Sequence, residues 1–381
     1  MRKKMRNVIL ILLLSVVVGI CGCSSPIKTE KKDSTRWSNN HAWQWYNDQP
    51  WLVGCNFTPS TAINQLEMWQ EDTFDLETID RELGWLNAIG MNFVRVYLHD
   101  MLWTQDKEGL LERIEKFLQV AERHNVKVMF VLLDSCWNPR PQLGTQPEPM
   151  PHVHNSGWVQ SPHIDLLKDP NRYDELKDYI VGVVGKFKND DRVLLWDIYN
   201  EPGNINGPAF RANELENKQD LALQLMNKLF QWAREVQPSQ PVSVCVWNWD
   251  KKKGNDFRSL NKFALENSDI VTFHIYSDAE KAQSQTMELV KYGRPIICTE
   301  YLARTKENTF ETMLPFFKKN KIGACNWGFV AGKTQTQYPW ESWDKKFTAE
   351  PAIWFHDILR PDGTPFDQNE IDLIKTLRRS K

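Results

Sequence analysis

The chain has 381 residues, of which 47 are Lys or Arg and 49 are Asp or Glu, and its formal net charge is -2. This length is enough for one large α/β barrel or for two ordinary domains. The balanced charge gives no long-range field that would favour nucleic acid or an anionic membrane surface as the main partner. The 17 Trp residues provide flat aromatic faces, which pack in a core or bind the apolar face of a ligand such as a sugar.

The N-terminus carries the signals of export. Basic residues at positions 2, 3, 4 and 6 precede an apolar run over 8–20, and this pattern is typical of a signal peptide. A run of about 13 apolar residues is short for a transmembrane helix. The following Ile20-Cys21-Gly22-Cys23 resembles a bacterial lipobox. We therefore predict a signal peptide over 1–22 and an exported lipoprotein that is anchored to a membrane through lipidated Cys23, on the periplasmic side or the cell surface.

The rest of the chain is predicted to be a polar tether over 23–40 and one folded domain over 41–381. From Trp51 onward, short apolar runs alternate with amphipathic segments of helical period, which indicates repeated βα units. Eight runs are predicted to be strands, at 51–57, 92–98, 127–133, 193–199, 241–247, 270–276, 295–300 and 323–329. This count predicts a single (β/α)8 TIM barrel. A doubly wound sheet is the alternative, but no glycine-rich phosphate loop follows any of the runs.

Helical segments between the runs support the count. Residues 78–89 form an apolar face and end at Gly90, which is a C-terminal signal of a helix. Pro315 interrupts the seventh helical segment, so we expect that helix to kink or to start late. Further helices are predicted over 110–124, 173–187 and 215–236, and a last one around 371–377.

Two connections are longer than simple barrel loops. Residues 134–171 follow the third strand, and residues 330–345 follow the eighth. Long loops in a compact fold are usually functional. Both leave from the carboxyl ends of strands, so we expect them to form walls above the mouth of the barrel.

The cysteine and histidine patterns do not predict a metal site. The five cysteines after Cys23 are scattered without zinc or redox spacing, so we expect free structural thiols, with one incidental disulfide as the alternative. His152, His154 and His163 invite a metal interpretation, but no carboxylate or cysteine stands at a fixed spacing from them. We expect neither a metal nor a cofactor.

Polar and aromatic side chains gather where the predicted strands end. Active sites of barrels are assembled from these ends. The candidates are Arg95 on the second strand, Asn200 and Glu201 at the fourth, His274 and Tyr276 at the sixth, Glu300 at the seventh and Trp327 at the eighth. Tyr97 shares a face of the second strand with Arg95 by period-2 alternation, so both can point inward.

Glu201 and Glu300 lie on strands that face each other across the predicted barrel. Two carboxyl groups about 5 Å apart are what a retaining glycosidase needs, because one attacks the anomeric carbon and the other transfers protons. The nucleophile must be ionised, and Arg95 and Tyr276 would favour this state of Glu300. The acid/base must be protonated at rest, and tryptophans such as Trp247 and Trp327 would favour this state of Glu201.

In this order, the motifs resemble those of family 5 of the clan A glycoside hydrolases, the group of cellulases and mannanases. Asn200-Glu201-Pro202 is similar to the family's Asn-Glu-Pro, and His274-Ile275-Tyr276 to its His-x-Tyr. The resemblance covers nearly the whole mature chain and includes Arg95, Glu300 and Trp327. It implies that Glu300 is the nucleophile, that Glu201 is the acid/base and that Asn200 binds the sugar 2-hydroxyl.

The third strand departs from the family pattern. Many members carry a histidine at its end, whereas this chain has Asp134-Ser135-Cys136-Trp137. His99, shortly after the second strand, is our candidate for a related position. Among the other tryptophans near strand ends, we assign Trp137 and Trp247 to the substrate-binding surface.

Two hypotheses of function follow. The first is a retaining β-glycoside hydrolase that cleaves a β-linked polysaccharide or oligosaccharide by double displacement, with β-mannan or β-glucan favoured and xylan as a further candidate. The second is a catalytically inactive, lipid-anchored glycan-binding protein on the same barrel. The presence of both glutamates favours the enzyme. We expect a monomer with a β-glycan and a lipid membrane as partners, and no nucleic acid.

Overall fold

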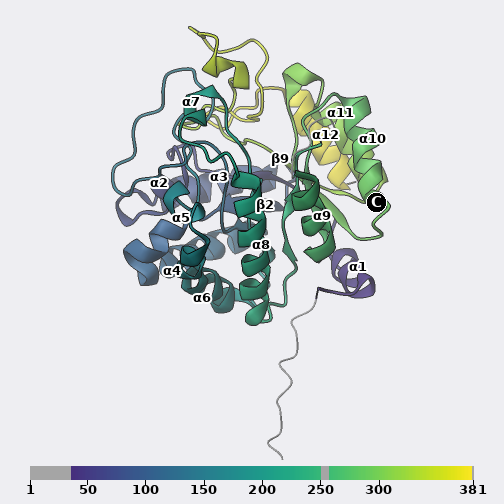
Figure 1. Ribbon diagram of the computed structural model, residues 1–381. Helices are drawn as coiled ribbons and strands as arrows, with labels where there is room; N and C mark the ends of the chain where they lie inside the picture. Colours follow the sequence, from purple (N-terminus) through teal and green to yellow (C-terminus); the bar gives the residue numbers. More distant parts are fainter. Residues whose placement is uncertain (1–35, 250–256, 380–381) are drawn as a thin grey trace, which may run out of the picture. The chain divides into compact units, whose positions relative to one another are not determined.

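The computed structural model describes residues 36–249 and 257–379, which lie in one compact unit. Parallel strands form a nearly closed barrel at its centre, and helices surround them (Figure 1). The strands of this nine-stranded sheet follow the order β5-β4-β3-β2-β1-β9-β8-β7-β6. This is the architecture of a (β/α)8 barrel, so the predicted fold class is confirmed.

Seven of the eight predicted runs each form one strand that is somewhat shorter than the run, and the fifth run forms two short strands. The strands are β1 (Val53–Asn56), β2 (Phe93–Tyr97), β3 (Lys127–Val131), β4 (Val193–Asp197), β5 (Val242–Ser243), β6 (Cys245–Val246), β7 (Val271–His274), β8 (Ile296–Glu300) and β9 (Gly323–Asn326). Eight runs give nine strands because the fifth run is divided at Val244, whose N–H donates to Ser268 Oγ at 3.0 Å instead of to a strand. β5 pairs with β4, and β6 pairs with β7.

Helices follow the strands in the expected places. They are α2 (Gln65–Trp69), α3 (Leu76–Ala88), α4 (Asp100–Arg123), α5 (Ile164–Leu167), α6 (Lys177–Phe187), α7 (Pro208–Arg211), α8 (Lys218–Glu235), α9 (Phe257–Asn267), α10 (Ala279–Val290), α11 (Phe310–Lys319) and α12 (Gln368–Arg379). Short 3-10 helices are η1 (Glu71–Thr73), η2 (Pro170–Leu176), η3 (Arg304–Lys306) and η4 (Trp340–Trp343). α4 begins before the predicted residue 110 because two helices join at Asp106, whose φ of -158° is not helical.

The predicted late start of the seventh helix is wrong. α11 begins at Phe310, ahead of Pro315, because Thr309 and Thr312 form a capping box at its first turn. Its apolar face, which includes Phe310 and Phe317, is buried, and this burial offsets the N–H that Pro315 lacks. The predicted last helix is present as α12, which packs against α11.

An N-terminal helix, α1 (Asn39–Asn47), covers the end of the barrel opposite the loops (Figure 1). Its Trp43 donates to the Gly293 carbonyl before β8, and its Tyr46 donates to the Lys321 carbonyl before β9. Ahead of α1, Arg36 donates to the Ser268 and Leu265 carbonyls. The packed unit therefore includes the last residues of the predicted tether.

The two long loops meet above the carboxyl ends of the strands, as predicted. His154 joins them, since its N–H donates to Ser342 Oγ at 2.9 Å and its carbonyl accepts from Trp343 Nε1 at 2.8 Å. Its Nδ1 lies 2.8 Å from the Tyr338 carbonyl, and burial lowers its pKa to about 4. His163 caps α5 by accepting from the Asp165 N–H. Both histidines therefore have structural partners.

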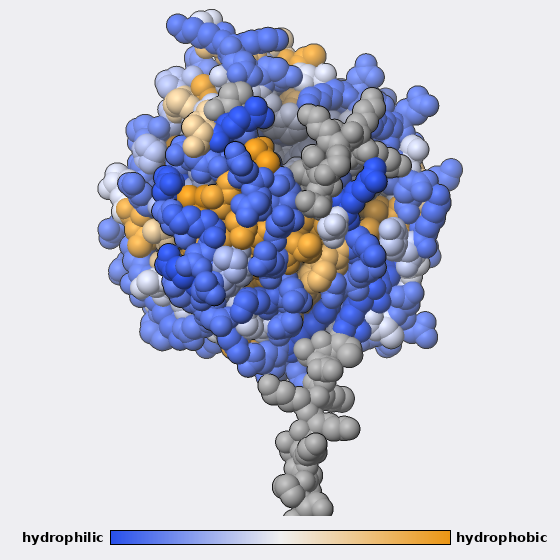
Figure 2. Space-filling view, in the orientation of Figure 1, coloured by the Kyte–Doolittle hydropathy of each residue, from blue (hydrophilic) through white to orange (hydrophobic). Residues whose placement is uncertain are grey.

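The surface and the cysteines fit a folded barrel. The face shown in Figure 2 is mostly hydrophilic, with small hydrophobic groups between. All five cysteines after Cys23 are free, as expected, and four of them are buried.

Within 36–249 and 257–379, no helix is long and apolar enough to cross a membrane. The apolar run over 8–20, Cys23 and most of the predicted tether lie outside these ranges.

Candidate active site

A cavity of about 350 Å³ opens at the carboxyl ends of the strands. Eight of the nine predicted catalytic and substrate-binding residues line it, namely Trp137, Asn200, Glu201, Trp247, His274, Tyr276, Glu300 and Trp327. The ninth, Arg95, is fully buried and donates to Asn200 and Glu300 from the barrel interior. The structure therefore brings all nine together.

Arg95 connects four strand ends. Its Nε and Nη2 donate to Asp197 Oδ2 at 3.0 and 2.8 Å, and its Nη1 donates to Glu300 Oε1 at 2.9 Å. Its Nη1 and Nη2 also donate to Asn56 Oδ1 and Asn200 Oδ1 at 2.7 and 2.6 Å. A buried guanidinium with two carboxylate partners is stable only with such complete pairing. Arg95 thus fixes the positions of Glu300 and Asn200 together.

Glu300 stands at the end of β8 among strong donors. Its Oε1 accepts from Tyr97 Oη at 2.9 Å in addition to Arg95, and its Oε2 accepts from Tyr276 Oη at 2.8 Å. Burial and the neighbouring Glu201 raise the pKa of this carboxyl above its usual value, and His274, Arg95 and the Tyr276 hydroxyl oppose that rise in part. Three donors, one of them a cation, therefore favour the ionised form of Glu300.

Glu201 follows β4 on a loop, in a different environment. Its φ of 41° lies in the left-handed region, where a residue with a side chain is strained. Its Oε2 accepts from Asn204 Nδ2 at 2.6 Å and lies 3.3 Å from the Cys136 thiol. Burial raises the pKa of Glu201, and these two neutral donors oppose it only in part. Among the described residues, no cation or phenol donates to Glu201, so its surroundings oppose the protonated form less than those of Glu300 do.

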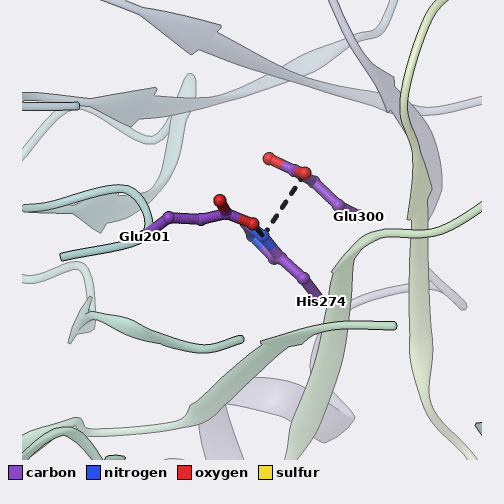
Figure 3. A group of neighbouring side chains, drawn as sticks. All are labelled: Glu201, His274 and Glu300. Carbon is purple, nitrogen blue, oxygen red and sulfur yellow. Dashed lines mark hydrogen bonds and ion pairs between the residues drawn. The ribbon is translucent and has the colours of Figure 1, made fainter. Parts of the chain in front are cut away.

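His274 lies between the two glutamates (Figure 3). Its Nδ1 is 2.8 Å from Glu201 Oε1 and 3.3 Å from Glu300 Oε2. Burial lowers the pKa of His274 to about 4, so the imidazole is neutral near pH 7. Side-chain atoms of these three residues lie within 4.8 Å of one another, which brings an oxygen of each glutamate within that distance.

The same three residues have the spacing of a metal site. Two observations count against that interpretation. His274 Nδ1 already has Glu201 Oε1 as its hydrogen-bond partner, and Arg95 holds a fixed positive charge 2.9 Å from Glu300, where it would repel a cation. The cluster is better described as two neighbouring carboxyl groups with a neutral histidine between them.

Aromatic side chains form one wall of the cavity. Trp327 packs edge-on against Tyr97 and Trp158. Trp158 Nε1 donates to Asp134 Oδ2 at 2.7 Å, and Asp134 Oδ1 accepts from Asn200 Nδ2 at 2.8 Å. The orientation of the Asn200 amide is therefore set by Arg95 on one side and Asp134 on the other.

The structure corrects one sequence-based assignment. His99 does not line the cavity, because its Nδ1 accepts from the Met101 N–H at the start of α4 and its Nε2 contacts the Gln160 carbonyl. Cys136 instead contributes the side chain beside Glu201 after β3. The predicted surroundings of Glu201 were tryptophans, which describes them only in part. The carboxyl group of Glu201 is also hydrogen-bonded to Cys136, Asn204 and His274.

Sequence reasoning missed several residues of the site. Asp197 ends β4, and period-2 alternation could have assigned it to the interior, as it did Tyr97 at the end of β2. Asn204 and Cys136 lie on loops, where no periodicity gives a signal.

A parallel barrel with two neighbouring glutamates at its mouth is typical of an O-glycosyl hydrolase. Residues 56–332 match the family model described as Cellulase (glycosyl hydrolase family 5), and the chain therefore belongs to glycosyl hydrolase family 5. Comparison with curated protein sequences found no match.

Solved structures share the fold at low sequence identity. A GH5_18 protein from Streptomyces cattleya in complex with Manb1-4GlcNAc is 13% identical, with a TM-score of 0.60 and coverage of 87% of this chain and 81% of that one. The endo-1,4-beta-mannanase of Rhizomucor miehei is 15% identical, with a TM-score of 0.57 and coverage of 87% and 96%. An exo-beta-1,4-mannosidase from an Opitutaceae bacterium is 14% identical, with a TM-score of 0.55 and coverage of 86% and 59%.

Proposed function

We propose that this protein is a retaining β-glycoside hydrolase with Glu300 as nucleophile and Glu201 as acid/base. The observation that carries the proposal is the pair itself, two carboxyl groups with oxygens within 4.8 Å in opposite surroundings. Retaining enzymes hold their carboxyl groups about 5 Å apart, whereas inverting enzymes need about 6.5–9.5 Å to admit a water molecule.

The reaction proceeds in two displacements. Glu300 attacks the anomeric carbon and forms a glycosyl ester, while Glu201 gives its proton to the leaving oxygen. Water then attacks the same carbon, Glu201 takes one of its protons, and Glu300 leaves as a carboxylate. Asn200, held between Arg95 and Asp134, is placed to bond the sugar 2-hydroxyl.

A β-1,4-mannan is the favoured substrate. Several structures of similar fold are named mannanases or mannosidases, including the endo-beta-1,4-mannanase of Thermotoga petrophila. β-Glucan is the second candidate, since the family model is described as a cellulase, and xylan is the third. A screen of these polysaccharides, with analysis of product length, distinguishes the three and separates internal from terminal cleavage.

The test of the mechanism uses an activated aryl β-glycoside. Glu300→Gln and Glu201→Gln each lower turnover by about 1,000-fold or more and leave the circular dichroism spectrum unchanged. NMR of the first product shows the β-anomer, and an initial α-anomer contradicts double displacement. Wild-type protein that binds a β-glycan without turning over any would favour the alternative, an inactive glycan-binding protein.

We further propose that Cys23 carries the lipid anchor of an exported lipoprotein. The support is the sequence alone, with a basic start, a short apolar run and Ile20-Cys21-Gly22-Cys23. The test is incorporation of labelled fatty acid in a bacterial host. Cys23→Ser abolishes the label and releases the protein from the membrane fraction, whereas the matched control Cys21→Ser retains both. Loss of label in Cys21→Ser alone would contradict the assignment.

A further inference from the structure

An exposed apolar patch lies at the end of the barrel opposite the active site. Seven large hydrophobic side chains of the described residues are well exposed, and three of them stand together at the end of α10. These are Met287, Val290 and Tyr292, which are 40%, 39% and 52% exposed. The other four lie on connections that follow the carboxyl ends of strands. The three at α10 therefore form a separate surface, far in the fold from the mouth of the barrel.

The N-terminal helix extends this surface. Trp43 of α1 is only partly buried, and its Nε1 donates at 2.9 Å to the carbonyl of Gly293, the residue after Tyr292. Met287 and Val290 are three residues apart and share one face of α10. The Tyr292 and Gly293 N–H groups donate to the Leu289 and Val290 carbonyls, so the turn after α10 has a defined conformation. We call Trp43, Met287, Val290 and Tyr292 the α10 patch.

The chain enters the fold beside the α10 patch. The Trp37 N–H donates to Asp269 Oδ1 at 2.8 Å, and Arg294 Nη2 donates to the Trp37 carbonyl at 2.7 Å. Arg294 directly follows Gly293, so this entry point adjoins the patch. Cys23 lies 13 positions before Arg36, and an extended chain of that length reaches at most about 45 Å. A lipid anchor at Cys23 would therefore keep this end of the barrel close to the membrane.

The chemistry of the patch suits a lipid surface. Trp and Tyr gather at membrane interfaces, because each combines an apolar ring with one polar group. Exposed lysines flank the patch, since Lys291 precedes Tyr292 and the Lys321 carbonyl accepts from Tyr46 of α1. Lysines near anionic headgroups add attraction, and Glu288 on the same turn is paired with Lys291 at 2.7 Å. Attachment through the same chain raises the effective concentration of the membrane at the patch, so a weak contact is sufficient.

We propose that the α10 patch docks on the lipid surface that carries the anchor, so that the mouth of the active site faces away from the membrane. The proposal rests on the proposed lipid anchor at Cys23 and is independent of which glycan is cleaved. It assigns an occupant to apolar side chains that the barrel leaves exposed, and it leaves the active-site cavity open to a substrate in the surrounding medium.

The test measures hydrogen exchange of the backbone amides at 290–294. The lipidated full chain is placed in vesicles of phosphatidylethanolamine and phosphatidylglycerol at 3:1, and the reference is Cys23→Ser protein in buffer. An amide in a docked patch exchanges mainly while the patch is undocked, so docking for about four-fifths of the time slows exchange about 5-fold.

A double variant and a matched control separate the patch from the anchor. Val290→Glu with Tyr292→Glu places two carboxylates where apolar groups would enter the interface, so exchange on vesicles returns to within about twofold of the reference. Both side chains are exposed, so the variant folds and still sediments with the vesicles. Ile353→Glu, which changes an exposed apolar residue on a connection after β9, keeps the 5-fold protection.

Three results overturn the proposal. They are equal exchange on vesicles and in buffer, protection that survives in the double variant, and a dimer of Cys23→Ser protein in sedimentation that the double variant abolishes. The dimer would show that a second copy of the chain covers the patch.

Failure of the lipid anchor is a distinct result, since the wild-type protein then carries no fatty acid and does not sediment with the vesicles. In that case the chain from residue 24, with an N-terminal hexahistidine tag, is bound to nickel-chelating lipid in the same vesicles. Protection at 290–294 that the double variant removes supports the patch as a membrane-docking surface, and unchanged exchange overturns it.

Discussion

The two glutamates of the site are held by different parts of the molecule. The donors to Glu300 are Arg95 and Tyr97 on β2 and Tyr276 just after β7, so the strands of the barrel place them. Glu201 Oε2 accepts from Cys136 and Asn204, which lie on the loops after β3 and β4, and its Oε1 contacts one strand residue, His274 at the end of β7. The strands therefore hold Glu300, whereas the loops supply two of the three hydrogen-bond partners of Glu201.

The two glutamates therefore differ in how far their surroundings can be changed without disturbing the fold. A fixed cation and two phenols give Glu300 an environment that cannot change without disturbing the sheet. The neutral amide and thiol beside Glu201 can be replaced without breaking a strand contact. Substitutions around Glu300 should accordingly affect rate and stability together, and substitutions around Glu201 should mainly move the pH dependence.

The largest expected effect is that of Arg95→Met, which leaves Asp197 and Glu300 buried without their cation. We expect kcat to fall about 100- to 1,000-fold, and the free energy of unfolding to fall by about 3–5 kcal/mol. Initial rates and urea denaturation measure the two effects. Lys291→Met, which removes the exposed partner of Glu288, is the matched control and changes stability by less than about 1 kcal/mol. Normal activity in Arg95→Met would refute the role of the cation.

Tyr276→Phe removes one donor to Glu300 and keeps the ring. A hydrogen bond to a charged group contributes about 1.5–3 kcal/mol, so we expect kcat to fall about 10- to 100-fold. The Tyr276 hydroxyl lowers the pKa of Glu300, so its loss raises that pKa and moves the acidic limb of the pH–rate profile to higher pH. Tyr173→Phe, whose hydroxyl donates to the Leu167 and Leu221 carbonyls, leaves the limb in place.

The contrast between strand and loop residues also explains which parts of the site can be predicted from the sequence. The eight runs that form the strands of the barrel, and the inward positions of Arg95, His274 and Glu300, follow from apolar runs and from alternation along a strand. Two glutamates at the ends of the fourth and seventh strands then meet because a barrel closes its sheet. The residues that touch Glu300, Tyr97 included, are therefore accessible to sequence reasoning.

Loop geometry follows from no such rule. His99 is close to a strand end in sequence, yet its ring caps α4 and does not reach the mouth of the barrel. The reason is that the first N–H groups of a helix have no partner within the helix and need a hydrogen-bond acceptor. Cys136 and Asn204 reach Glu201 only through the particular path of two loops, which includes a left-handed Glu201. Such contacts depend on tertiary structure and leave no periodic trace in the sequence.

Asn204→Ala tests the loop side of the comparison. The Asn204 amide donates to Glu201 Oε2 at 2.6 Å and lowers the pKa of Glu201. Its removal raises that pKa, so the alkaline limb of the pH–rate profile moves up by about one pH unit, with only a several-fold change in kcat at the optimum. Asn320→Ala, whose amide donates to the Phe316 carbonyl at the end of α11, leaves the limb unchanged. A shift of the acidic limb instead would reverse the two roles.

Cys136 gives the smallest and sharpest test, because two substitutions should act in opposite directions. The thiol is a weak donor to Glu201 Oε2, and it lowers the pKa of Glu201. Cys136→Ser supplies a stronger donor at the same position, so the alkaline limb moves to lower pH by about half a unit. Cys136→Ala removes the donor, and the limb moves to higher pH by a similar amount. If both variants shift the limb in the same direction, the side chain acts through its volume, and the hydrogen bond from the thiol does not set the proton affinity of Glu201.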